Sequence, residues 1–527
     1  MLHSFIAAAV LLLSGLYLYG KLEVWVAARR FRRLHGVVKA KHAREGDRFG
    51  ILYFLHMLRS LRNHTVLESL KETFDKWGEN FEVTMLFRTN LQTVDPENIK
   101  TVLATKFADF DLGRRYEAFF PTLGDGIFTL DYEGWSHSRA LLRPQFSRHQ
   151  VSDVAKLESH VSNLFKAMPH SATESCEIQE LLFRMTMDSA TEFLFGESVN
   201  SLVLSDDAAS DNGPATTAQR VASDSGKRGF AAAFNNVQEY LSMRVLFQSL
   251  YWLVNTSEFR ENNMIVHEFV DYYVEKALAK RHSNEKISLS ENRYVFLDAL
   301  AEETQDPRTL RDQLLNILLA GRDTTAGALT WAFYELARHP RVFEKLRAEI
   351  LERFGDHPGA EGKLPMNFET LKNSLYLRYI LNEILRLYPS VPQNFRIANK
   401  HTFLPRGGGQ DGTEPIFIRK GEAVFYSVYC MHRRKDLYGD DAMEFRPERW
   451  AEGKTWHWEY LPFNGGPRIC LGQQYALTEA GYTLARVAQE FDTIETTDPD
   501  EPNGVPLKKA NLTMSSAKGV HVRCYKK

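Results

Sequence analysis

The spacing of apolar residues predicts a mainly helical protein. Apolar side chains recur at the helical period over several long stretches. These stretches are Val151–Met168, Ile178–Phe195, Phe230–Arg244, Asn263–Arg281 and Thr309–Arg338. The last of them predicts one helix of roughly 45 Å that stops at Pro340.

Shorter segments rich in β-favouring residues predict a minor sheet component. Phe81–Leu86 and Asn90–Val94 flank a short polar break, which is the pattern of a hairpin. Further on, Leu512–Met514 and Gly519–Arg523 predict strands on either side of a turn, and the run from Gly407 to Gly409 predicts a tight surface turn. The expected fold class is therefore mainly α with a minor β component.

The first residues of the chain predict a membrane anchor. Leu2–Gly20 is almost entirely apolar, and a helix of that length would span about 28 Å, close to the roughly 30 Å hydrocarbon core of a bilayer. Basic residues follow the span and only His3 precedes it, which predicts a cytosolic body. A cleaved signal peptide is the alternative, although a basic leading region and a small-residue cleavage site are missing. The basic residues that follow are expected to make residues 21–66 an interfacial linker against anionic headgroups.

The composition is that of a globular protein and argues against several classes of function. The 527 residues carry a formal net charge of −2, so nothing suggests nucleic acid or a strongly acidic substrate as a partner. The four cysteines form no CxxC pair, which argues against a zinc cluster or disulfide framework and fits a reducing compartment. Cys430 and His432 form an isolated CxH pair that we interpret as structural. The polar segment Ser205–Gly229 is expected to be a mobile loop within a domain.

The most informative stretch surrounds Cys470. It lies in a loop rich in glycine and proline, Phe463–Gly472, and a helical run over Gln473–Val487 follows directly. A thiolate at the start of a helix is stabilised by the helix dipole and by free backbone N–H groups. Nearby glycines would let the backbone approach a bulky flat group, and Arg468 could pair with an acidic group on it. This pattern indicates an axial sulfur ligand to haem iron, and a buried structural cysteine is the alternative.

A polar break in the long predicted helix is the second candidate site. Ala320–Thr325 places Asp323 and Thr324 inside an otherwise apolar helix, at a cost in stability that calls for a reason. Threonine hydroxyls can bond to earlier carbonyls and open the helix locally, which makes room for water or a diatomic ligand. An acid beside a threonine can then relay protons. A polar patch that kinks the helix, or a threonine cap that starts a second helix, is the alternative.

Two residue pairs at helical spacing complete the candidate set. Glu383 and Arg386 lie at i, i+3 and can pair, although this spacing recurs elsewhere in what are more simply solvated pairs, worth under about 1 kcal/mol. Trp135 and Arg139 lie at i, i+4, and their indole N–H and guanidinium could both donate to a haem propionate. An ordinary aromatic–cation surface pair is the alternative for these two.

Together these motifs resemble those of the cytochromes P-450. The pattern phenylalanine, two residues, glycine, x, arginine, x, cysteine, x, glycine in Phe463–Gly472 is similar to the haem-binding loop of that family. Motifs in the family's order cover about Leu67 to Lys527, so residues 67–527 are the expected haem-thiolate catalytic domain, behind an anchor at 1–20 and the linker at 21–66. Within the family the chain resembles the fungal microsomal alkane and fatty-acid hydroxylases over Leu123–Ser147, Leu385–Ala398, Leu404–Gly412 and Gly466–Ala480.

The resemblance implies a role for each candidate residue. Cys470 would be the axial thiolate of haem b and would favour O–O cleavage, while Asp323 and Thr324 would deliver protons to the distal oxygen. Glu383, Arg386 and Arg449 would form a structural triad behind the haem. Further haem contacts would come from Trp135, Arg139, Arg396, Arg468, Phe463, Gly466 and Gly472. Substrate contacts would come from apolar residues that are equally consistent with core packing, namely Phe119, Phe120, Leu123, Phe128, Leu319, Val391, Phe395 and Met514.

The implied activity is monooxygenation that depends on NADPH and O₂, with terminal hydroxylation of long-chain fatty acids or n-alkanes. No flavin or nicotinamide fingerprint is present in the sequence, so electrons would come from a membrane NADPH–cytochrome reductase docked on the basic side that bears Cys470. Related animal fatty-acid hydroxylases often carry a glutamate, ester-linked to haem, where this chain has Ala320, so no such link is expected. The implied location is the endoplasmic reticulum membrane, with a single span and the catalytic domain in the cytosol.

Three other functions stay open on the sequence alone. The same haem chemistry could act on a fungal secondary metabolite or an aromatic compound, because motifs at the iron do not report the substrate pocket. A thiolate-haem isomerase or peroxygenase would need no reductase, although the pair of Asp323 and Thr324 argues against it. A haem-binding sensor would give a haem spectrum without turnover.

Overall fold

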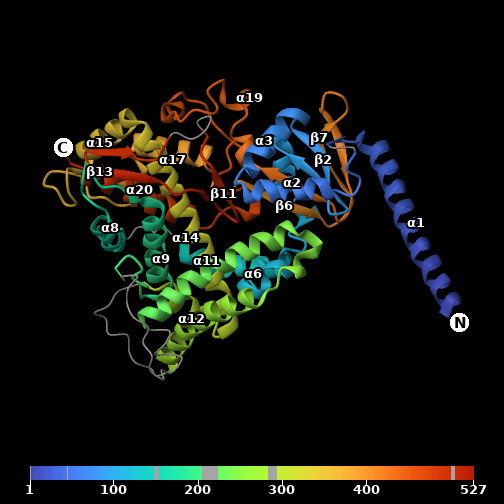
Figure 1. Ribbon diagram of the computed structural model, residues 1–527, viewed down its shortest axis with the longest axis horizontal. Coiled ribbons are helices and arrows are strands. Elements are labelled where there is room, and N and C mark those ends of the chain that lie inside the picture. The colour runs from blue at the N-terminus through green and yellow to red at the C-terminus, as the bar shows by residue number, and fades with distance from the viewer. Residues whose placement is uncertain are drawn as a thin grey trace.

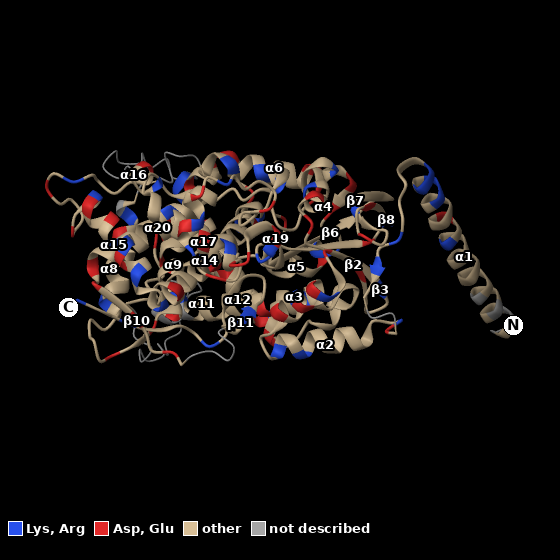
Figure 2. Cartoon of the chain, turned by 90° about the horizontal axis from the view of Figure 1, so that it is seen from above, with Lys and Arg blue, Asp and Glu red and all other residues tan. Residues whose placement is uncertain are grey.

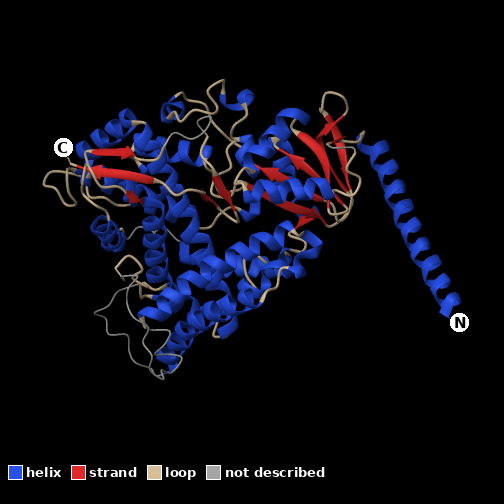
Figure 3. Ribbon diagram, in the orientation of Figure 1, coloured by secondary structure: helices blue, strands red, loops and turns tan. Residues whose placement is uncertain are grey.

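The computed structural model describes residues 2–43, 46–146, 154–203, 223–282, 294–499 and 505–526, and it confirms a mainly helical fold with small sheets (Figure 1, Figure 3). The helices are α1 (Leu2–His35), α2 (Ile51–Arg62), α3 (Val66–Trp77), α4 (Pro96–Lys100), α5 (Arg115–Leu123), α6 (Tyr132–Leu142), α8 (Ala155–Ala167), α9 (Ile178–Phe195), α11 (Asp224–Leu246), α12 (Ser257–His282), α13 (Phe296–Glu303), α14 (Pro307–Arg338), α15 (Pro340–Phe354), α16 (Phe368–Lys372), α17 (Leu375–Leu387), α18 (Val428–Met431), α19 (Lys435–Tyr438) and α20 (Gln473–Glu490). The strands are β1 (Lys41–His42), β2 (Asn80–Met85), β3 (Arg88–Thr93), β4 (Phe110–Asp111), β5 (Cys176–Glu177), β6 (Gln393–Ala398), β7 (Thr402–Gly408), β8 (Glu414–Ile418), β9 (Ala423–Ser427), β10 (Thr493–Thr496), β11 (Lys508–Ala510), β12 (Met514–Ser516) and β13 (His521–Tyr525).

Helix α14 joins the two apolar cores of the body. The Asp306 carboxylate caps its first turn by accepting the Thr309 N–H at 2.9 Å, and Pro307 takes the first helical position. Buried apolar residues between 310 and 319 pack in a core with α9, α11, α12 and α13, whereas those between 329 and 337 pack in a core with α15, α17 and α20. The polar break at 320–325 lies between the two cores. The helix continues through it, so the expected local opening is not found.

The largest sheet has six strands in the order β1-β2-β3-β9-β6-β4 and lies at the end of the body nearest α1 (Figure 3). Its hairpin β2–β3 confirms the prediction, with Asn80 paired to Thr93 and Met85 to Arg88. Strand β9 joins β3 in parallel and β6 in antiparallel register, which brings β6 under the cavities described below. Strand β6 follows α17 after a short segment, and its register against β9 pairs Phe395 with Phe425.

Helix α1 projects away from the body, and its Lys and Arg residues gather towards the end nearest the body (Figure 1, Figure 2). Residues Leu11–His35 are apolar enough to cross a membrane, with a mean hydropathy of 1.2 over the best window, and that window is not buried in the protein. The predicted anchor is therefore part of a longer helix that ends at His35, where the Phe31 ring contacts the rings of Phe403 and Phe417. This finding supports membrane anchoring.

The predicted linker contains regular structure. Helix α1 continues into it, β1 follows, and α2 packs on the body through Tyr53, which is buried in the same core as Leu67 of α3. The division of the chain at residues 20 and 66 stays a prediction.

Three local predictions are corrected. Residues 205–222 of the proposed mobile loop lie outside the described residues, but 224–229 begin α11, where the Ser223 hydroxyl caps the helix by accepting the Gly226 N–H. Gly407 and Gly408 lie in β7 at an irregularity of the β7–β8 pairing, and the turn follows them. The two final strands begin two residues later than predicted and belong to different sheets, with β12 paired to β11 and β13 to β10 and β5.

The predicted long helices are otherwise found. Helix α9 has the predicted bounds, α11 and α12 extend beyond theirs at both ends, and α14 begins two residues earlier than predicted and ends at Arg338 as predicted. Of the helix predicted over 151–168, residues 151–153 lie outside the described part of the chain and the rest contains α8.

Candidate active site

Two adjoining cavities lie beside the middle of α14. The first, here called the thiol cavity, has a volume of about 270 Å³ and is bordered by Cys470. The second, here called the outer cavity, has a volume of about 310 Å³ and is lined by α2, the β2–β3 hairpin and the end of α11. They share the wall residues Arg115, Phe128, Ala320, Thr324, Val391 and Asn394. The two cavities therefore adjoin along these six residues.

Cys470 is held in place by the backbone of its own loop. Its N–H donates to the Phe463 carbonyl at 3.0 Å, and the Ile469 N–H donates to the Gly466 carbonyl at 3.1 Å. Cys470 is exposed towards this cavity, while the surrounding protein desolvates its thiol. Burial raises the pKa of the thiol, and the Gly472 N–H and the Arg139 charge oppose that rise. A bound metal cation is what would hold this sulfur as a thiolate.

Four arginines converge on the thiol cavity, and we call Arg115, Arg139, Arg396 and Arg468 the arginine cluster. Three of them were predicted, and Trp135 lies among them with the Arg468 guanidinium 4.5 Å from the centre of its ring. One carboxylate pairs with the cluster among the described residues, that of Asp131, at 2.7 Å from Arg468 Nη2. Burial and the neighbouring arginines lower the pKa of Arg115 to about 9 and that of Arg468 to about 10.

The residues around the thiol cavity fit haem b. Cationic side chains crowded together in a protein interior repel one another unless an anion neutralises them, so the arginine cluster indicates an anionic ligand. A sulfur ligand borders the same cavity, and the remaining wall is largely apolar, with Ile317, Leu385 and Leu477 among its residues. A flat apolar ring with an iron centre and two carboxylates matches this combination of donors.

The polar break of α14 places its two candidates on different sides of the helix. Thr324 lines both cavities, and its hydroxyl donates to the Ala320 carbonyl at 2.6 Å, the predicted back-bond. Asp323 lines neither cavity; it is buried and pairs with Arg322 at 3.0 Å. Burial raises the pKa of Asp323, and the Arg322 charge opposes that rise. The acid and the hydroxyl therefore do not face the same space.

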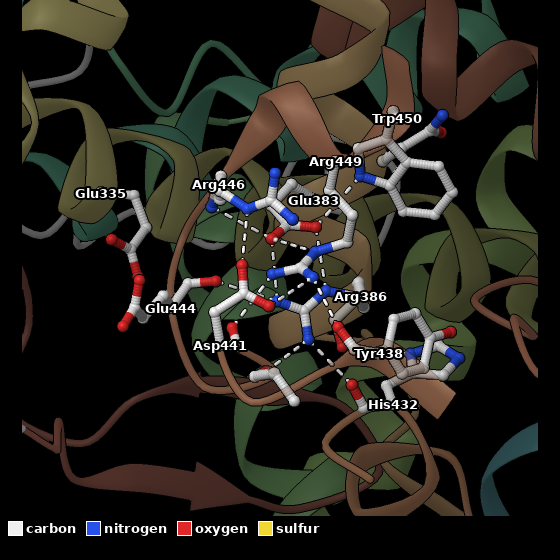
Figure 4. Close-up of polar contacts among 12 residues, drawn as sticks. Glu335, Glu383, Arg386, His432, Tyr438, Asp441, Glu444, Arg446, Arg449 and Trp450 are labelled. Atoms are coloured by element: carbon white, nitrogen blue, oxygen red, sulfur yellow. Dashed lines mark hydrogen bonds and ion pairs between the residues drawn. The ribbon is translucent and has the colours of Figure 1, made fainter. Parts of the chain in front are cut away.

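The predicted triad forms a buried cluster on α17, a helix that packs against α20 (Figure 4). Glu383 binds Arg386 through two hydrogen bonds of 2.8 and 2.9 Å, and Arg449 Nε lies 3.3 Å from the same carboxylate. Trp450 Nε1 donates to Glu383 at 3.0 Å. Arg386 also donates to the carbonyls of His432, Ala442 and Glu444, and so ties α17 to the segment before the Cys470 loop. Each of these contacts is internal, which fits a structural role.

The predicted substrate residues fall into two groups. Phe119, Phe128, Leu319, Val391 and Phe395 line the outer cavity. The other three line neither cavity: Leu123 and Met514 are buried in the two apolar cores, and Phe120 packs against Tyr116. Their apolar character gave no means of separating cavity wall from core.

Of the loop residues proposed as haem contacts, some line the thiol cavity and one does not. Phe463 and Gly472 line the thiol cavity. Gly466 does not; its φ is 69°, and a Cβ there would lie 2.0 Å from the Leu103 carbonyl oxygen. Its role is close packing of the loop against the backbone of residues 101–105, which is a different reason for glycine from the predicted one.

Two other features bear on the sequence predictions. Arg115, the first residue of α5, was missed, because a single arginine outside a motif gives no spacing signal. Cys430 and His432 of the CxH pair are buried, and the His432 ring bonds the Arg386 carbonyl and the Leu461 N–H. Among the described residues, no group of three His, Cys, Asp or Glu could hold a metal ion.

Comparison with known proteins agrees with this geometry. The family model described as cytochrome P450 matches residues 46–518. The chain is 52% identical to cytochrome P450 52A12 of Debaryomyces hansenii over 88% of each chain. It is 52% identical to cytochrome P450 52A5 of Candida maltosa over 84% of this chain and 82% of the relative, and 47% identical to cytochrome P450 52A8 of Candida tropicalis over 95% of each. Together the matched fold, the cysteine loop and these relatives show that the chain belongs to the cytochrome P450 family.

Proposed function

We propose that this protein is a membrane-anchored haem-thiolate monooxygenase that hydroxylates the terminal carbon of long-chain fatty acids or n-alkanes. The observation that carries the proposal is that Cys470 and Thr324 border one cavity, which adjoins a second cavity with largely apolar walls. An elongated apolar molecule in the outer cavity would present one end in front of Cys470. The sequence resemblance to fungal alkane and fatty-acid hydroxylases supports the same substrate class.

The residues of the thiol cavity divide the work of holding the cofactor. Haem b, when bound, supplies the activation of O₂ and the attack on the C–H bond. Cys470 would be its axial ligand, and the arginine cluster with Trp135 would bind its propionates. Ala320 offers no carboxylate for an ester bond, so the cofactor would be held without a covalent link.

Thr324 would hold a proton donor at the reacting end of the substrate. One oxygen atom enters the C–H bond and the other leaves as water, which consumes two electrons from NADPH and two protons. The Thr324 hydroxyl borders the cavity where those protons are needed. Asp323, the residue before Thr324, lies away from the cavity, so it would replenish that donor only after a change of its side-chain conformation.

Electrons would come from an NADPH–cytochrome reductase in the same membrane. The catalytic body, proposed to cover residues 67–527, would lie on the cytosolic face of the endoplasmic reticulum behind a single span. The basic residues after the span would rest on anionic headgroups.

Turnover in membranes reconstituted with reductase and NADPH tests the proposal. The panel holds fatty acids and alkanes of about 10 to 18 carbons, with products mapped by mass spectrometry, and Cys470→Ala is the inactive reference. Terminal hydroxylation with the wild type, and no thiolate-type band in the reduced CO complex of Cys470→Ala, is the expected result. Oxidation of NADPH without a lipid product would overturn the substrate class, and lipid oxidation driven by peroxide alone would overturn the dependence on a reductase.

A further inference from the structure

The segment 124–131, which joins α5 to α6, forms part of the wall where the two cavities adjoin. Phe128 borders both cavities, and Ile127 borders the thiol cavity. The segment consists of turns and bends and contains no helix or strand. Its place relative to the cavities therefore depends on bonds from neighbouring elements.

Helix α14 holds this segment through Asn316. The Asn316 side chain is fully buried, and its Oδ1 accepts the Phe128 N–H at 3.1 Å. Its Nδ2 donates to the Leu123 carbonyl at 2.9 Å and to the Asp312 carbonyl of its own helix at 2.8 Å. The side-chain amide thus uses its acceptor and both of its N–H donors, and it bonds the backbone on either side of the turn at 124–127.

Gly126 shows how closely the segment approaches Asn316. A Cβ at position 126 would lie 2.3 Å from Asn316 Nδ2 and 2.5 Å from its Cγ. Atoms in van der Waals contact lie about 3.5–4.0 Å apart, so only glycine permits this approach. The backbone at 126 is not in the left-handed region, so the obstacle to alanine there is the Asn316 side chain.

Two further groups bond the same segment. The Asp312 carboxylate of α14 accepts the Asp125 N–H at 2.9 Å. From the cysteine loop, Arg468 donates to the Leu130 carbonyl at 3.0 Å. The segment is therefore held between α14 and the cysteine loop, and the bond to Phe128 itself comes from α14.

We propose that Asn316 is a positioning residue that fixes Phe128 at the junction of the cavities and so sets which carbon of an aliphatic chain lies in front of Cys470. Asn316 lines neither cavity, so it acts through the segment that it bonds. The end of an aliphatic chain has no polar group, so only contact with the cavity wall can distinguish the terminal carbon from the next one. A primary C–H bond is also stronger than a secondary one, so terminal attack needs a wall that stays in place. The inference rests on the proposed function, because it presumes hydroxylation near the end of a chain.

The test compares Asn316→Ala with Asn263→Ala as a matched control. Asn263 is also a buried asparagine on a long helix, α12, but it lines neither cavity. Its Nδ2 donates to the Phe259 carbonyl at 2.7 Å, within its own helix. The reduced CO spectrum of each full-length variant establishes that the haem site is intact. Terminal and subterminal alcohols formed from one fatty acid with reductase and NADPH are then separated and quantified.

Asn316→Ala is expected to lower the ratio of terminal to subterminal alcohol roughly tenfold, because a small displacement of the wall changes the alignment of the reacting carbon. Asn263→Ala should leave that ratio as in the wild type, although both variants lose a buried amide. An unchanged ratio in Asn316→Ala with an intact spectrum would overturn the proposal. An equal change of the ratio in both variants would overturn it as well.

Gly126→Ala tests the same contact from the side of the segment. Its methyl group would push the segment away from Asn316, so the product ratio should shift in the same direction. In the double variant with Asn316→Ala, the three side-chain atoms nearest to that methyl group are absent. The second substitution should then have little further effect, because the two act at one contact. Additive effects would place them at separate contacts and overturn the proposal.

Hydrogen exchange needs no turnover and separates this inference from the proposed function. The Phe128 amide should exchange roughly tenfold faster in Asn316→Ala than in the wild type, because its acceptor is gone. Asn263→Ala should leave that rate unchanged, and equal rates in Asn316→Ala and the wild type would overturn the role of Asn316. If the wild type forms no lipid product, the proposed function is overturned together with the choice of carbon, and the exchange rate reports on the Asn316 contact alone.

Discussion

The Glu383 carboxylate and the Arg386 guanidinium bind each other through two hydrogen bonds, with both side chains fully buried. The Glu383 carboxylate has further partners: it pairs with Arg449 and accepts hydrogen bonds from the Trp450 indole N–H and the Arg446 backbone N–H. A buried ion pair costs desolvation, which is offset only when its geometry and its other hydrogen bonds are good. The cluster therefore holds α17, η5 (Pro447–Ala451) and the segment before the Cys470 loop in one arrangement.

Glu383→Gln should destabilise the protein strongly, because it leaves Arg386 buried without its counter-charge and removes one of the two carboxylates that pair with Arg449. The expected loss is about 3–5 kcal/mol of unfolding free energy, accompanied by poor haem retention. Denaturation followed by circular dichroism, together with the reduced CO spectrum, measures both. Lys71→Ala is the control, because Lys71 pairs with Asp75 at the surface, where such a pair is worth under about 1 kcal/mol. Equal effects of the two substitutions would refute the structural role of the triad.

The E-x-x-R spacing shows how far sequence reasoning reaches. Glu335 and Arg338 share this spacing but form no pair, because Glu335 accepts from the Tyr388 hydroxyl and Arg338 donates to the Tyr334 carbonyl. Arg347 likewise bonds Asp492 instead of Glu344. Spacing places two side chains on one face, whereas the partner is chosen by what packs against that face. The family pattern singled out Glu383 correctly for this reason: it includes the downstream segment that supplies Arg449.

Arg115→Met should have opposite effects on the empty and the haem-bound protein. Without haem, removing one of several mutually repelling arginines should stabilise the fold. With haem, the loss of one charge-assisted hydrogen bond to a propionate should cost about 1.5–3 kcal/mol, or roughly 10- to 100-fold in affinity. Thermal unfolding of the haem-free protein and the rate of haem transfer to apomyoglobin test the two signs.

The control for that experiment is Arg114→Met, which changes an exposed neighbour outside both cavities. If Arg115→Met left haem transfer as slow as in the wild type, Arg115 would not be a propionate ligand, and its low pKa would reflect burial alone.

Acid should loosen the Cys470 loop through His432. The Leu461 N–H donates to Nε2 of this ring at 2.9 Å, so the ring is the neutral tautomer that donates from Nδ1 to the Arg386 carbonyl at 3.0 Å. Burial and the nearby Arg386 charge lower the pKa of His432 to about 3. The unfolded chain therefore binds a proton that the folded protein does not, and stability falls as the pH drops from about 6.5 to about 3.

The pH dependence of unfolding in His432→Gln isolates this contribution. An amide preserves one donor and one acceptor but does not titrate, so the variant should lose less stability than the wild type over that window, by on the order of 4 kcal/mol. His357→Gln changes an exposed histidine and serves as the control. If the unfolding free energies of the wild type and His432→Gln fell equally with pH, protonation of the His432 ring would not destabilise the fold, and the prediction would be wrong.

The residues whose positions were predicted correctly are those whose neighbours are close in the sequence, which a short motif can describe. Cys470, Thr324 and the pair of Glu383 and Arg386 depend on local spacing within a loop or helix, and local spacing is preserved in the fold. Asp323, Gly466 and Met514 were placed less well, because the face each one takes depends on segments distant in the chain. Gly466, for example, packs on the Leu103 carbonyl, more than three hundred residues away.

Thr324→Val should uncouple NADPH oxidation from product formation. The substitution keeps the side-chain shape but removes the hydroxyl that borders both cavities, so more of the reducing equivalents should leave as peroxide. General acid catalysis of this kind contributes about 100-fold or more, so a fall of roughly tenfold in product per NADPH is expected. Peroxide and product are measured together in the reconstituted membrane.

Thr330→Val separates the cavity hydroxyl from its back-bond. Thr330 lies on the same helix, its hydroxyl donates to the Ala326 carbonyl at 2.8 Å, and it lines neither cavity. Each substitution removes one side-chain hydrogen bond, worth about 1 kcal/mol, so the two variants should be destabilised to a similar extent. Only Thr324→Val should release peroxide, because only Thr324 borders the thiol cavity. If both variants leaked peroxide equally, the back-bond and the rigidity of α14 would control coupling, and the hydroxyl would have no direct part in proton delivery.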